Sequence, residues 1–327
     1  MAAVLAGKTG DGEGVKLLYH SFSKSGGDKL IWKLDSGRLR ILCYHGVCED
    51  YLADQPWMPQ SFVTASAFER QLQYLARNAE VLPLPEAVRR LQNGSLPDRC
   101  VSLTFDDGYA NNYTLAYPLL KKHGMPATIF VSSAYMESGE FFPFLKVKLL
   151  QLGRAANLPD YKTAPLNEVE HAVSGYWHQA RLQLSDEQRR TLRPLSVEEI
   201  RSMDLSLVEF APHSHTHCIL RNETAERRRE EIRTSVRKVR EWASGPVRLF
   251  SYPNGQRGDF DEQDKDVLRA EGIVAAVSGI SGANDRHTDM LELRRYPVAL
   301  FHDDAGFRAE VTGFRSAVLT ATRRRAS

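Results

Sequence analysis

The sequence predicts an α/β fold in which helices surround a parallel sheet that is either open or closed into a barrel. Apolar runs typical of buried strands alternate with amphipathic stretches typical of helices between residues 39 and 131. The same alternation resumes after residue 195, beyond a helical interruption. The chain has 327 residues, a length that a single α/β barrel domain often reaches.

The elements of the first half follow from periodicity and capping residues. Buried strands are predicted at residues 39–44, 81–84, 101–105 and 127–131, and helices at 67–78, 85–91 and a stretch ending at 123. Ser66 is the expected N-cap of the first helix, Pro85 opens the second, and Gly124 is the expected C-cap of the third.

Residues 135–195 interrupt this alternation with a mixed helical segment that contains Trp177. Two interpretations stay open: an insertion on the rim that shapes a substrate cleft, or an ordinary helical excursion that touches no ligand. Ser196 and Glu199 then form a capping-box pattern. Further strands are predicted at residues 207–210, 247–250 and 273–277, with helices at 225–243 and 261–271.

One domain is expected, at residues 38–305, with the helical insertion at about 135–195 inside it. Residues 1–37 predict an N-terminal arm, either flexible or a short helical lead-in, and residues 306–327 predict a C-terminal tail. The first apolar run is too short for a signal peptide, and no window approaches the length of a transmembrane helix. The sequence therefore predicts a cytoplasmic protein without a transmembrane segment, with membrane association left open.

The composition is that of an ordinary globular protein, with 42% hydrophobic and 26% charged residues. The 43 basic and 41 acidic residues give a net charge of +2, so no global field favours nucleic acid as a partner. No two of the four cysteines form a CxxC pair, which argues against a thiolate zinc site. Cys43 lies in an apolar stretch and predicts a buried free thiol.

An acidic turn stands at the end of the predicted strand at 101–105. Asp106 and Asp107 follow the strand directly, and Gly108 follows them. Because acids often fill turns, this pair alone is weak evidence for a site.

Three histidines follow the predicted strand at 207–210. His213 and His217 are four residues apart, a spacing that on a helical turn places both rings on one face, within reach of a single ion. His215 lies between them and is expected to point the other way. Zinc commonly takes imidazole nitrogens and one carboxylate, which the acidic turn can supply, and leaves a position for water.

Both segments end strands of the same predicted parallel sheet, and the carboxyl ends of such strands meet at the rim where active sites usually lie. A metal ion held there would lower the pKa of bound water toward about 7. One aspartate would bind the metal and the other would accept the proton of that water. The residues alone leave open which of Asp106 and Asp107 takes which role.

Four segments resemble motifs of the polysaccharide deacetylases, the NodB-homology group of carbohydrate esterase family 4. Residues 104–109 (TFDDGY) are similar to the first motif, residues 213–217 (HSHTH) to the second, and residues 250–255 (FSYPNG) to the third. Residues 43–47 (CYHGV) resemble the opening strand of one branch of the family. The resemblance runs in the right order from about residue 38 to 300 and makes this stretch a polysaccharide deacetylase (NodB-homology) domain.

This resemblance implies an irregular (β/α)7-type barrel of the NodB-like kind and a role for each matched residue. Asp106 would be the catalytic base, and the metal ligands would be Asp107, His213 and His217. The backbone N–H of Asn254 would help to stabilise the oxyanion of the tetrahedral intermediate.

The implied reaction is hydrolysis of N-acetyl groups on the amino sugars of a glycan, which gives acetate and a free amine. The partner would be an N-acetylated polysaccharide, oligosaccharide or lipid-linked saccharide. The implied cofactor is a divalent metal, with zinc expected and cobalt or nickel open, because two histidines and a carboxylate suit all three. The native metal, the glycan and the oligomeric state stay open.

The chain departs from the family pattern at three places. The family often has a tyrosine where Asn254 stands, a change that a backbone donor tolerates. The family often has an arginine in the third motif that braces the catalytic aspartate, but Ser251 holds that position, with Arg248 three residues earlier. The late Leu-x-His motif that supplies a general acid is not evident, and residues 291–295 (LELRR) occupy its region. His45 is the best-placed substitute for this acid, with bracing of the acidic turn as its alternative role. Further candidates are His287 and His302.

These departures leave two alternatives to an active deacetylase. One is a deacetylase-like protein that binds carbohydrate but has lost catalysis. The other is a metal-dependent hydrolase of another small amide or ester, with a cleft narrowed by the helical insertion.

Overall fold

The computed structural model describes residues 13–34, 37–153, 158–243, 246–300, 303–315 and 318. Its main sheet consists of β1 (Arg40–Tyr44), β4 (Glu80–Val81), β5 (Cys100–Phe105), β6 (Ala127–Val131), β7 (Val208–Pro212), β8 (Leu249–Ser251), β9 (Ala275–Ser281) and β10 (Leu293–Pro297). A separate short pair is formed by β2 (Val47–Cys48) and β3 (Val63–Thr64).

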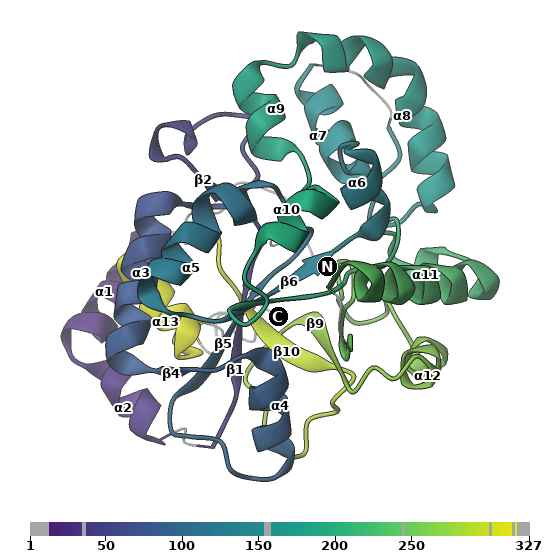
Figure 1. The fold of residues 1–327 in the computed structure, drawn as a ribbon. Coiled ribbons are helices and arrows are strands. Elements are labelled where there is room, and N and C mark those ends of the chain that lie inside the picture. Colours follow the sequence, from purple (N-terminus) through teal and green to yellow (C-terminus); the bar gives the residue numbers. More distant parts are fainter. Residues whose placement is uncertain are drawn as a thin grey trace, which may run out of the picture.

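The strands of the main sheet form a nearly closed parallel barrel (Figure 1). Their order is β7-β6-β5-β1-β10-β9-β8, with β4 beside β5, and every pairing in the sheet is parallel. The two strands at the ends of this order, β7 and β8, also contact each other. The prediction of an irregular α/β barrel is therefore confirmed.

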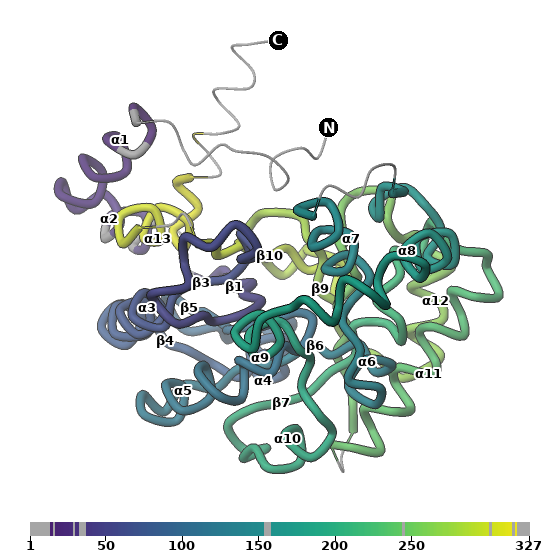
Figure 2. The backbone as a smooth tube through the Cα atoms, turned by 90° about the horizontal axis from the view of Figure 1, so that it is seen from above, coloured from purple at the N-terminus to yellow at the C-terminus, as the bar shows by residue number. Residues whose placement is uncertain are grey.

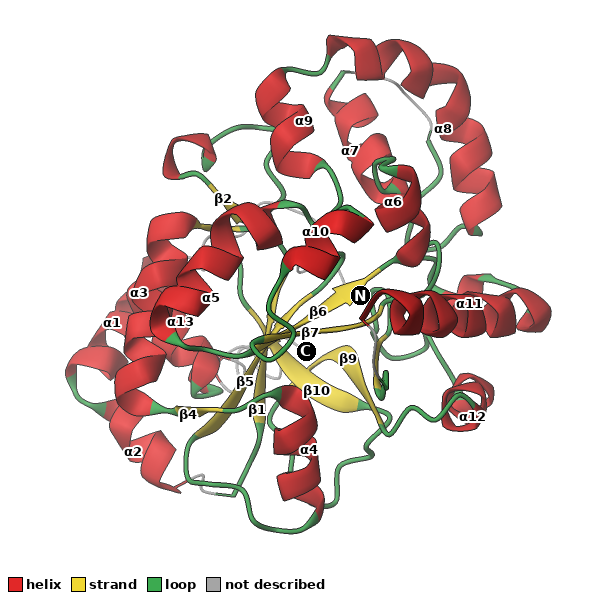
Figure 3. Cartoon of the chain, viewed as in Figure 1, coloured by secondary structure: helices red, strands yellow, loops and turns green. Residues whose placement is uncertain are grey.

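Helices surround the barrel on its outer side (Figure 3). They are α1 (Glu13–Lys24), α2 (Gly27–Leu34), α3 (Ala65–Asn78), α4 (Leu84–Gln92), α5 (Tyr117–His123), α6 (Ser133–Ser138), α7 (Pro143–Leu152), α8 (Leu166–Ala180), α9 (Asp186–Leu192), α10 (Val197–Ser202), α11 (Ala225–Ala243), α12 (Glu262–Ala270) and α13 (Asp304–Val311). Short helical turns are η1 (Asp50–Leu52), η2 (Asn112–Ala116), η3 (Arg181–Gln183) and η4 (Leu220–Asn222).

The two faces of the sheet bury different side chains, because successive residues of a strand point to opposite sides. Leu103, Phe105 and Ile129 pack against the surrounding helices in the largest hydrophobic cluster. Ile41 and Leu293, near the starts of their strands, belong to a second cluster that includes the apolar face of α4. Helix α4 thus covers the amino end of the barrel. The polar groups lie at the opposite end, where the strands have their carboxyl ends.

Two predicted elements of the first half need correction. The expected N-cap Ser66 is wrong: Thr64 caps α3, and Ser66 instead donates its hydroxyl to Asp50. The predicted strand at 81–84 is reduced to β4, because Pro83 has no N–H for a sheet and serves as the N-cap residue of α4. The expected C-cap at Gly124 is confirmed, with a left-handed φ of 60°.

In the second half, the predicted strand at 273–277 begins two residues later, as β9. Gly272 adopts a left-handed φ of 76°, and the Ile273 N–H still donates to the Leu268 carbonyl at 3.0 Å. Ile273 therefore completes the end of α12 and does not start the strand. The capping box of Ser196 and Glu199 is confirmed at α10.

The interruption at 135–195 contains α7, α8 and α9, which gather on one side of the barrel (Figure 1). Val147, Val169 and Trp177 give this helical insertion a small core of its own. At the other side, α1 packs against α13 and α2, and α13 packs against α3 (Figure 2). Helix α13 spans the domain boundary expected at residue 305, and that boundary stays a prediction. No helix among the described residues combines the length and apolarity needed to cross a bilayer.

Candidate metal centre and catalytic site

The acidic turn lies directly after β5, at the carboxyl end of the barrel. The Asp106 N–H donates to the Tyr44 carbonyl at 2.9 Å, which continues the pairing of β5 with β1. Asp107 and Gly108 then adopt left-handed φ angles of 71° and 77°. A Cβ at Gly108 would lie 2.8 Å from Val131 Cγ1, so glycine is needed there. The strained turn directs two buried carboxylates into the barrel mouth.

The histidine segment follows β7, two strands along the sheet from β5. The expectation of a helical turn is wrong: residues 213–217 form a loop, in which Ser214 and His217 both have a left-handed φ of 57°. The buried Glu231 of α11 holds this loop by accepting the N–H groups of His215 and Thr216 at 2.9 and 2.7 Å. His215 points away as expected, with its Nδ1 2.8 Å from Ser133 Oγ.

Asp107, His213 and His217 come together as one cluster. Each offers one ligand atom, and these atoms lie within 4.8 Å of one another. Asp107 Oδ1 is 3.0 Å from His217 Nε2 and 3.6 Å from His213 Nε2. All three residues are buried. This is the donor set that the sequence predicted, and the left-handed backbone of the loop, not a helix, produces it.

The hydrogen bonds of the two rings show that this cluster fits a cation. His213 Nδ1 lies 2.8 Å from the Ser251 carbonyl, which can only accept, so Nδ1 carries the proton and Nε2 presents a lone pair. His217 Nδ1 is engaged by the Tyr161 hydroxyl at 2.7 Å. With both Nδ1 atoms occupied, the two Nε2 atoms and a carboxylate oxygen face one another, which is an arrangement that can hold a metal ion.

The electrostatics of His213 agree with this conclusion. Burial alone would lower the pKa of His213, but the Asp106 and Asp107 carboxylates beside it raise that pKa. The negative charge of these two carboxylates attracts a cation, either a proton or a metal ion, to the Nε2 atom of His213. Burial lowers the pKa of His217, which favours the neutral ring that a metal ligand must have.

Asp106 is held in a different way from its neighbour. The Arg295 guanidinium grips it with two hydrogen bonds, Nη1 to Oδ1 at 2.7 Å and Nη2 to Oδ2 at 2.6 Å. Ser251 Oγ lies 3.3 Å from Oδ1, and Cys43 Sγ lies 3.5 Å from Oδ2. Burial alone would raise the pKa of Asp106, but the charge of Arg295 holds it at about 2. Asp106 therefore stays ionised and fixed beside the ligand cluster.

Arg295 is the functional residue that the sequence reasoning missed. The arginine expected in the third motif is absent, and Arg248, the alternative considered, is exposed at the surface. Arg295 comes from β10. In the sheet, β1 lies between β10 and β5, the strand that Asp106 directly follows. A signal was present: Leu293 faces the barrel interior, and a two-residue period puts Arg295 on the same face.

The candidates for a general acid are separated by the structure. His45 follows β1, and one of its ring nitrogens lies within 4.8 Å of ligand atoms of Cys43 and Asp106. Its Nδ1 is buried without a hydrogen-bond partner among the described residues, so this atom makes no bracing bond to the acidic turn. His287 is exposed in a surface turn beside Asp285, and His302 lies outside the described residues.

Asn254 lies in the turn after β8 with a left-handed φ of 57°. Its side chain donates to Asp259 Oδ2 at 2.6 Å, which fixes the turn. Within the described part of the chain its backbone N–H has no acceptor, as a donor to a substrate oxyanion requires. Its role in catalysis stays a prediction.

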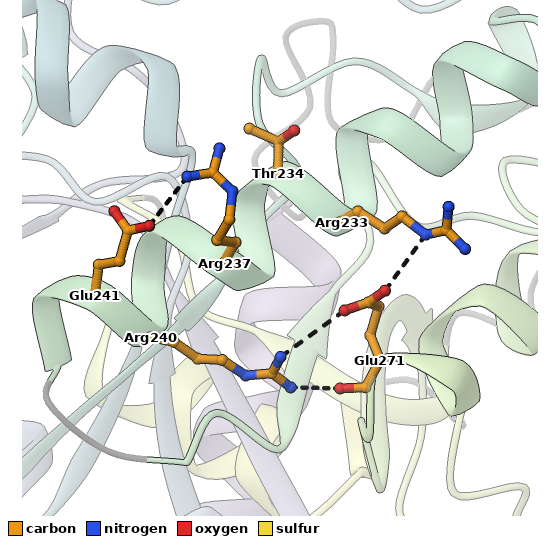
Figure 4. Close-up of a pocket in the computed structure, with 6 residues that line it drawn as sticks. All are labelled: Arg233, Thr234, Arg237, Arg240, Glu241 and Glu271. Atoms are coloured by element: carbon orange, nitrogen blue, oxygen red, sulfur yellow. Dashed lines mark hydrogen bonds and ion pairs between the residues drawn. The ribbon is translucent and has the colours of Figure 1, made fainter.

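A surface hollow of about 590 Å³ lies elsewhere, on α11 (Figure 4). It is lined by Arg233, Thr234, Arg237, Arg240, Glu241 and Glu271. These arginines and glutamates pair with one another across the open surface (Figure 4). No candidate ligand or base lines this hollow, so the hollow and the reactive groups do not coincide.

Comparisons with known proteins show the family of this chain. A family model described as Polysaccharide deacetylase matches residues 93–276, more than half of the chain. YxkH of Bacillus subtilis strain 168, provisionally named a polysaccharide deacetylase, is 23% identical over 280 residues, which cover 85% of this chain and 77% of that protein. A poly-beta-1,6-N-acetyl-D-glucosamine N-deacetylase of Staphylococcus epidermidis is 38% identical over 80 residues, 24% of this chain and 28% of that one.

Solved structures show the same fold at low sequence identity. The deacetylase PplD of Streptococcus pyogenes, solved with acetate, has a TM-score of 0.59 and 19% identity, over 85% of this chain and 99% of that one. IcaB of Ammonifex degensii has a TM-score of 0.56 and 19% identity, over 84% of this chain and 97% of that one.

Proposed function

The chain belongs to the polysaccharide deacetylase family, and from this premise we propose that it is a metal-dependent hydrolase that removes N-acetyl groups from the amino sugars of a glycan. One observation carries the proposal. Asp107, His213 and His217 converge as ligands within 4.8 Å of one another, and Asp106 stands beside them as a separately held carboxylate. The two aspartates thus divide the work between metal binding and proton transfer.

The metal would be held by Asp107 Oδ1 and the Nε2 atoms of His213 and His217. Two imidazoles and a carboxylate suit zinc, with cobalt and nickel as the alternatives. When bound, such an ion supplies a Lewis acid and lowers the pKa of a water molecule to about 7.

The chain's own residues supply the remaining steps. Asp106, kept ionised by Arg295, accepts the proton of the water that attacks the acetyl carbonyl. The backbone N–H of Asn254 donates to the oxygen on which negative charge develops. His45, which has a ring nitrogen within 4.8 Å of an Asp106 carboxylate oxygen and is not in the ligand set, protonates the sugar nitrogen as the C–N bond breaks. The products are acetate and the free amine.

The carbohydrate-binding alternative loses part of its support from this arrangement. It rested on a missing arginine and a missing late histidine. Arg295 braces Asp106 from another strand, so the absence of an arginine from the third motif does not leave the base unsupported. The replacement for the late histidine is still to be tested, and His45 is the residue to test.

The experiment that tests the proposal is acetate release from N-acetylglucosamine oligomers with zinc or cobalt present. We expect release that stops when a chelator removes the metal and returns when the metal is restored. Comparison with monomeric N-acetylglucosamine separates a glycan deacetylase from a hydrolase of small amides. A metal-loaded protein that binds the oligomers but releases no acetate would contradict the proposal and favour the binding protein.

A further inference from the structure

The helical insertion touches the candidate metal ligand His217 from two directions. At the start of α7, the Phe144 ring lies 4.9 Å and the Phe142 ring 5.9 Å from the His217 ring, measured between centroids. From the segment that precedes α8, Tyr161 places its hydroxyl 2.7 Å from His217 Nδ1. The insertion therefore surrounds this ring on the side away from Asp107.

The hydrogen bonds of the Tyr161 hydroxyl have a defined direction. The hydroxyl also contacts the backbone carbonyl of His217, and a carbonyl can only accept. The hydroxyl proton therefore goes to that carbonyl, and the hydroxyl oxygen accepts the proton on Nδ1. His217 then presents an unprotonated Nε2 toward Asp107 Oδ1, 3.0 Å away. The same hydroxyl also holds the backbone of His217 in its left-handed conformation, with φ at 57°.

The segment that carries Tyr161 is itself fixed to the chain that follows the histidine loop. Asn222 Nδ2 donates to the carbonyls of Lys162 and Ala164, each at 3.2 Å. Glu223 Oε1 accepts the N–H of Leu166, the first residue of α8, at 2.8 Å. The segment around Tyr161 is thus held by the chain that follows the candidate ligand His217, and Tyr161 is not a loose surface side chain.

We propose that Tyr161 is a positioning residue for His217 and couples the metal centre to the helical insertion. The inference rests on the proposed metal site but not on the identity of the glycan. The hydroxyl sets the ring tautomer and orientation that the metal needs. Metal binding and the contact between Tyr161 and His217 are two coupled equilibria, and such coupling is reciprocal. If the contact favours metal binding, the bound metal in turn strengthens the contact. Metal binding therefore orders the segment around Tyr161.

The test is zinc affinity of the Tyr161→Phe variant, measured by competition with a chelating dye. Loss of a partner behind a metal-bound histidine typically weakens metal affinity by about 10- to 100-fold, and we expect a loss of about 10-fold here. The matched control is Tyr176→Phe, because Tyr176 lies in α8 of the same insertion but is 54% exposed. The control should bind zinc as the unmodified protein does.

Hydrogen exchange gives a second readout, independent of activity. In the unmodified protein, zinc should slow amide exchange in residues 158–166, and in Tyr161→Phe it should do so much less. Asn222→Ala, which loosens the same segment without touching His217, should weaken zinc binding in the same direction and by a smaller factor.

The outcomes separate this inference from the proposed function. If the unmodified protein binds no zinc, the metal centre itself is wrong. If it binds zinc and Tyr161→Phe binds equally well, with exchange in residues 158–166 unaffected by metal, the positioning role of Tyr161 is overturned while the metal centre stands.

Discussion

Charged side chains gather at two places in this molecule, the carboxyl end of the barrel and the surface hollow on α11, and they are arranged in opposite ways. In the hollow, Arg233 and Arg237 keep about three fifths of their side chains exposed, at 59% and 60%, and pair with Glu271 and Glu241. At the barrel mouth, the side chains of Asp107 and His213 are exposed by 4% and 2%.

The balance of charge differs as well. Two carboxylates and one guanidinium at the barrel mouth leave one net negative charge when both imidazoles are neutral, and that charge is buried. An unpaired buried charge costs free energy, so a cation bound at the barrel mouth would be favourable. The hollow pairs its charges in water, where each pair is worth only about 0–1 kcal/mol. The reactive region is thus identified by buried charges that lack a partner of opposite charge, and not by the presence of a hollow.

The largest effect is expected from removal of a metal ligand. His213→Ala should reduce bound zinc from one ion per chain to almost none, and acetate release should fall by at least about 10³-fold, because the metal contributes several kcal/mol to the rate. The measurements are metal content after dialysis and initial rate. His215→Ala is the control, because its ring lies against Ser133 outside the ligand set. Zinc lost from the control and retained by His213→Ala would contradict the assignment.

The next effect concerns the brace on Asp106. Without the guanidinium, the buried carboxylate is no longer held at a pKa of about 2. In Arg295→Met its pKa should rise, so the acidic limb of the pH–rate profile should move to higher pH. The rate at neutral pH should fall by about 10- to 100-fold, within the range that a positioned base supplies.

Arg294→Met is the matched control, because Arg294 is the exposed neighbour on the same strand. An acidic limb that is the same in Arg295→Met and in Arg294→Met would show that Arg295 does not hold Asp106 in the working enzyme.

A buried charge that lacks a strong partner provides a third test. Glu209 of β7 has a buried Oε2 without a hydrogen-bond partner among the described residues, and burial raises its pKa to about 7. Because the pKa of Glu209 is raised in the folded state, its contribution to stability is present below pH 4.5, the ordinary pKa of a glutamate, and is lost as pH rises through about 7. Glu209→Gln should therefore gain about 2 kcal/mol in unfolding free energy at pH 8 and little at pH 4.

Urea denaturation at the two pH values measures this difference. Equal gains at both pH values would mean that the charge of Glu209 is already compensated in the folded protein.

The smallest effect is expected in the hollow. Arg237→Ala removes a side chain that is 60% exposed and whose ion pair within the described part of the chain is with Glu241, four residues away in α11. We expect the unfolding free energy to change by less than about 0.5 kcal/mol, with metal content and rate unchanged. A large loss of activity in this variant would show that the hollow has a function after all.

The ligand cluster could be predicted from the sequence because each of its two motifs directly follows a strand. Asp106 and Asp107 follow β5, His213 follows β7, and a parallel sheet brings both carboxyl ends to one rim. The loop conformation of 213–217 could not be read from the sequence, because positive φ angles at Ser214 and His217 are rare outside glycine and leave no periodic signal.

Arg295 and Tyr161 could not be placed in the same way. Arg295 is 189 residues from Asp106, and only the strand order β5-β1-β10 brings them together. Tyr161 belongs to the helical insertion, whose mixed composition carries no pattern that connects it with the histidine loop. The two-residue period puts Arg295 on the interior face of its strand, but it does not say which carboxylate Arg295 meets. That contact, like the contact of Tyr161 with His217, depends on topology that local sequence does not record.

The central claim is that two adjacent aspartates have unlike roles, and a matched pair of variants tests it most directly. Zinc content and acetate release should be measured side by side for Asp106→Asn and Asp107→Asn. We expect Asp106→Asn to keep one zinc ion per chain while its rate falls by at least about 10²-fold, because only the base is lost. Asp107→Asn should lose the zinc together with the activity. Zinc retained by Asp107→Asn and lost from Asp106→Asn would contradict the account and exchange the two roles.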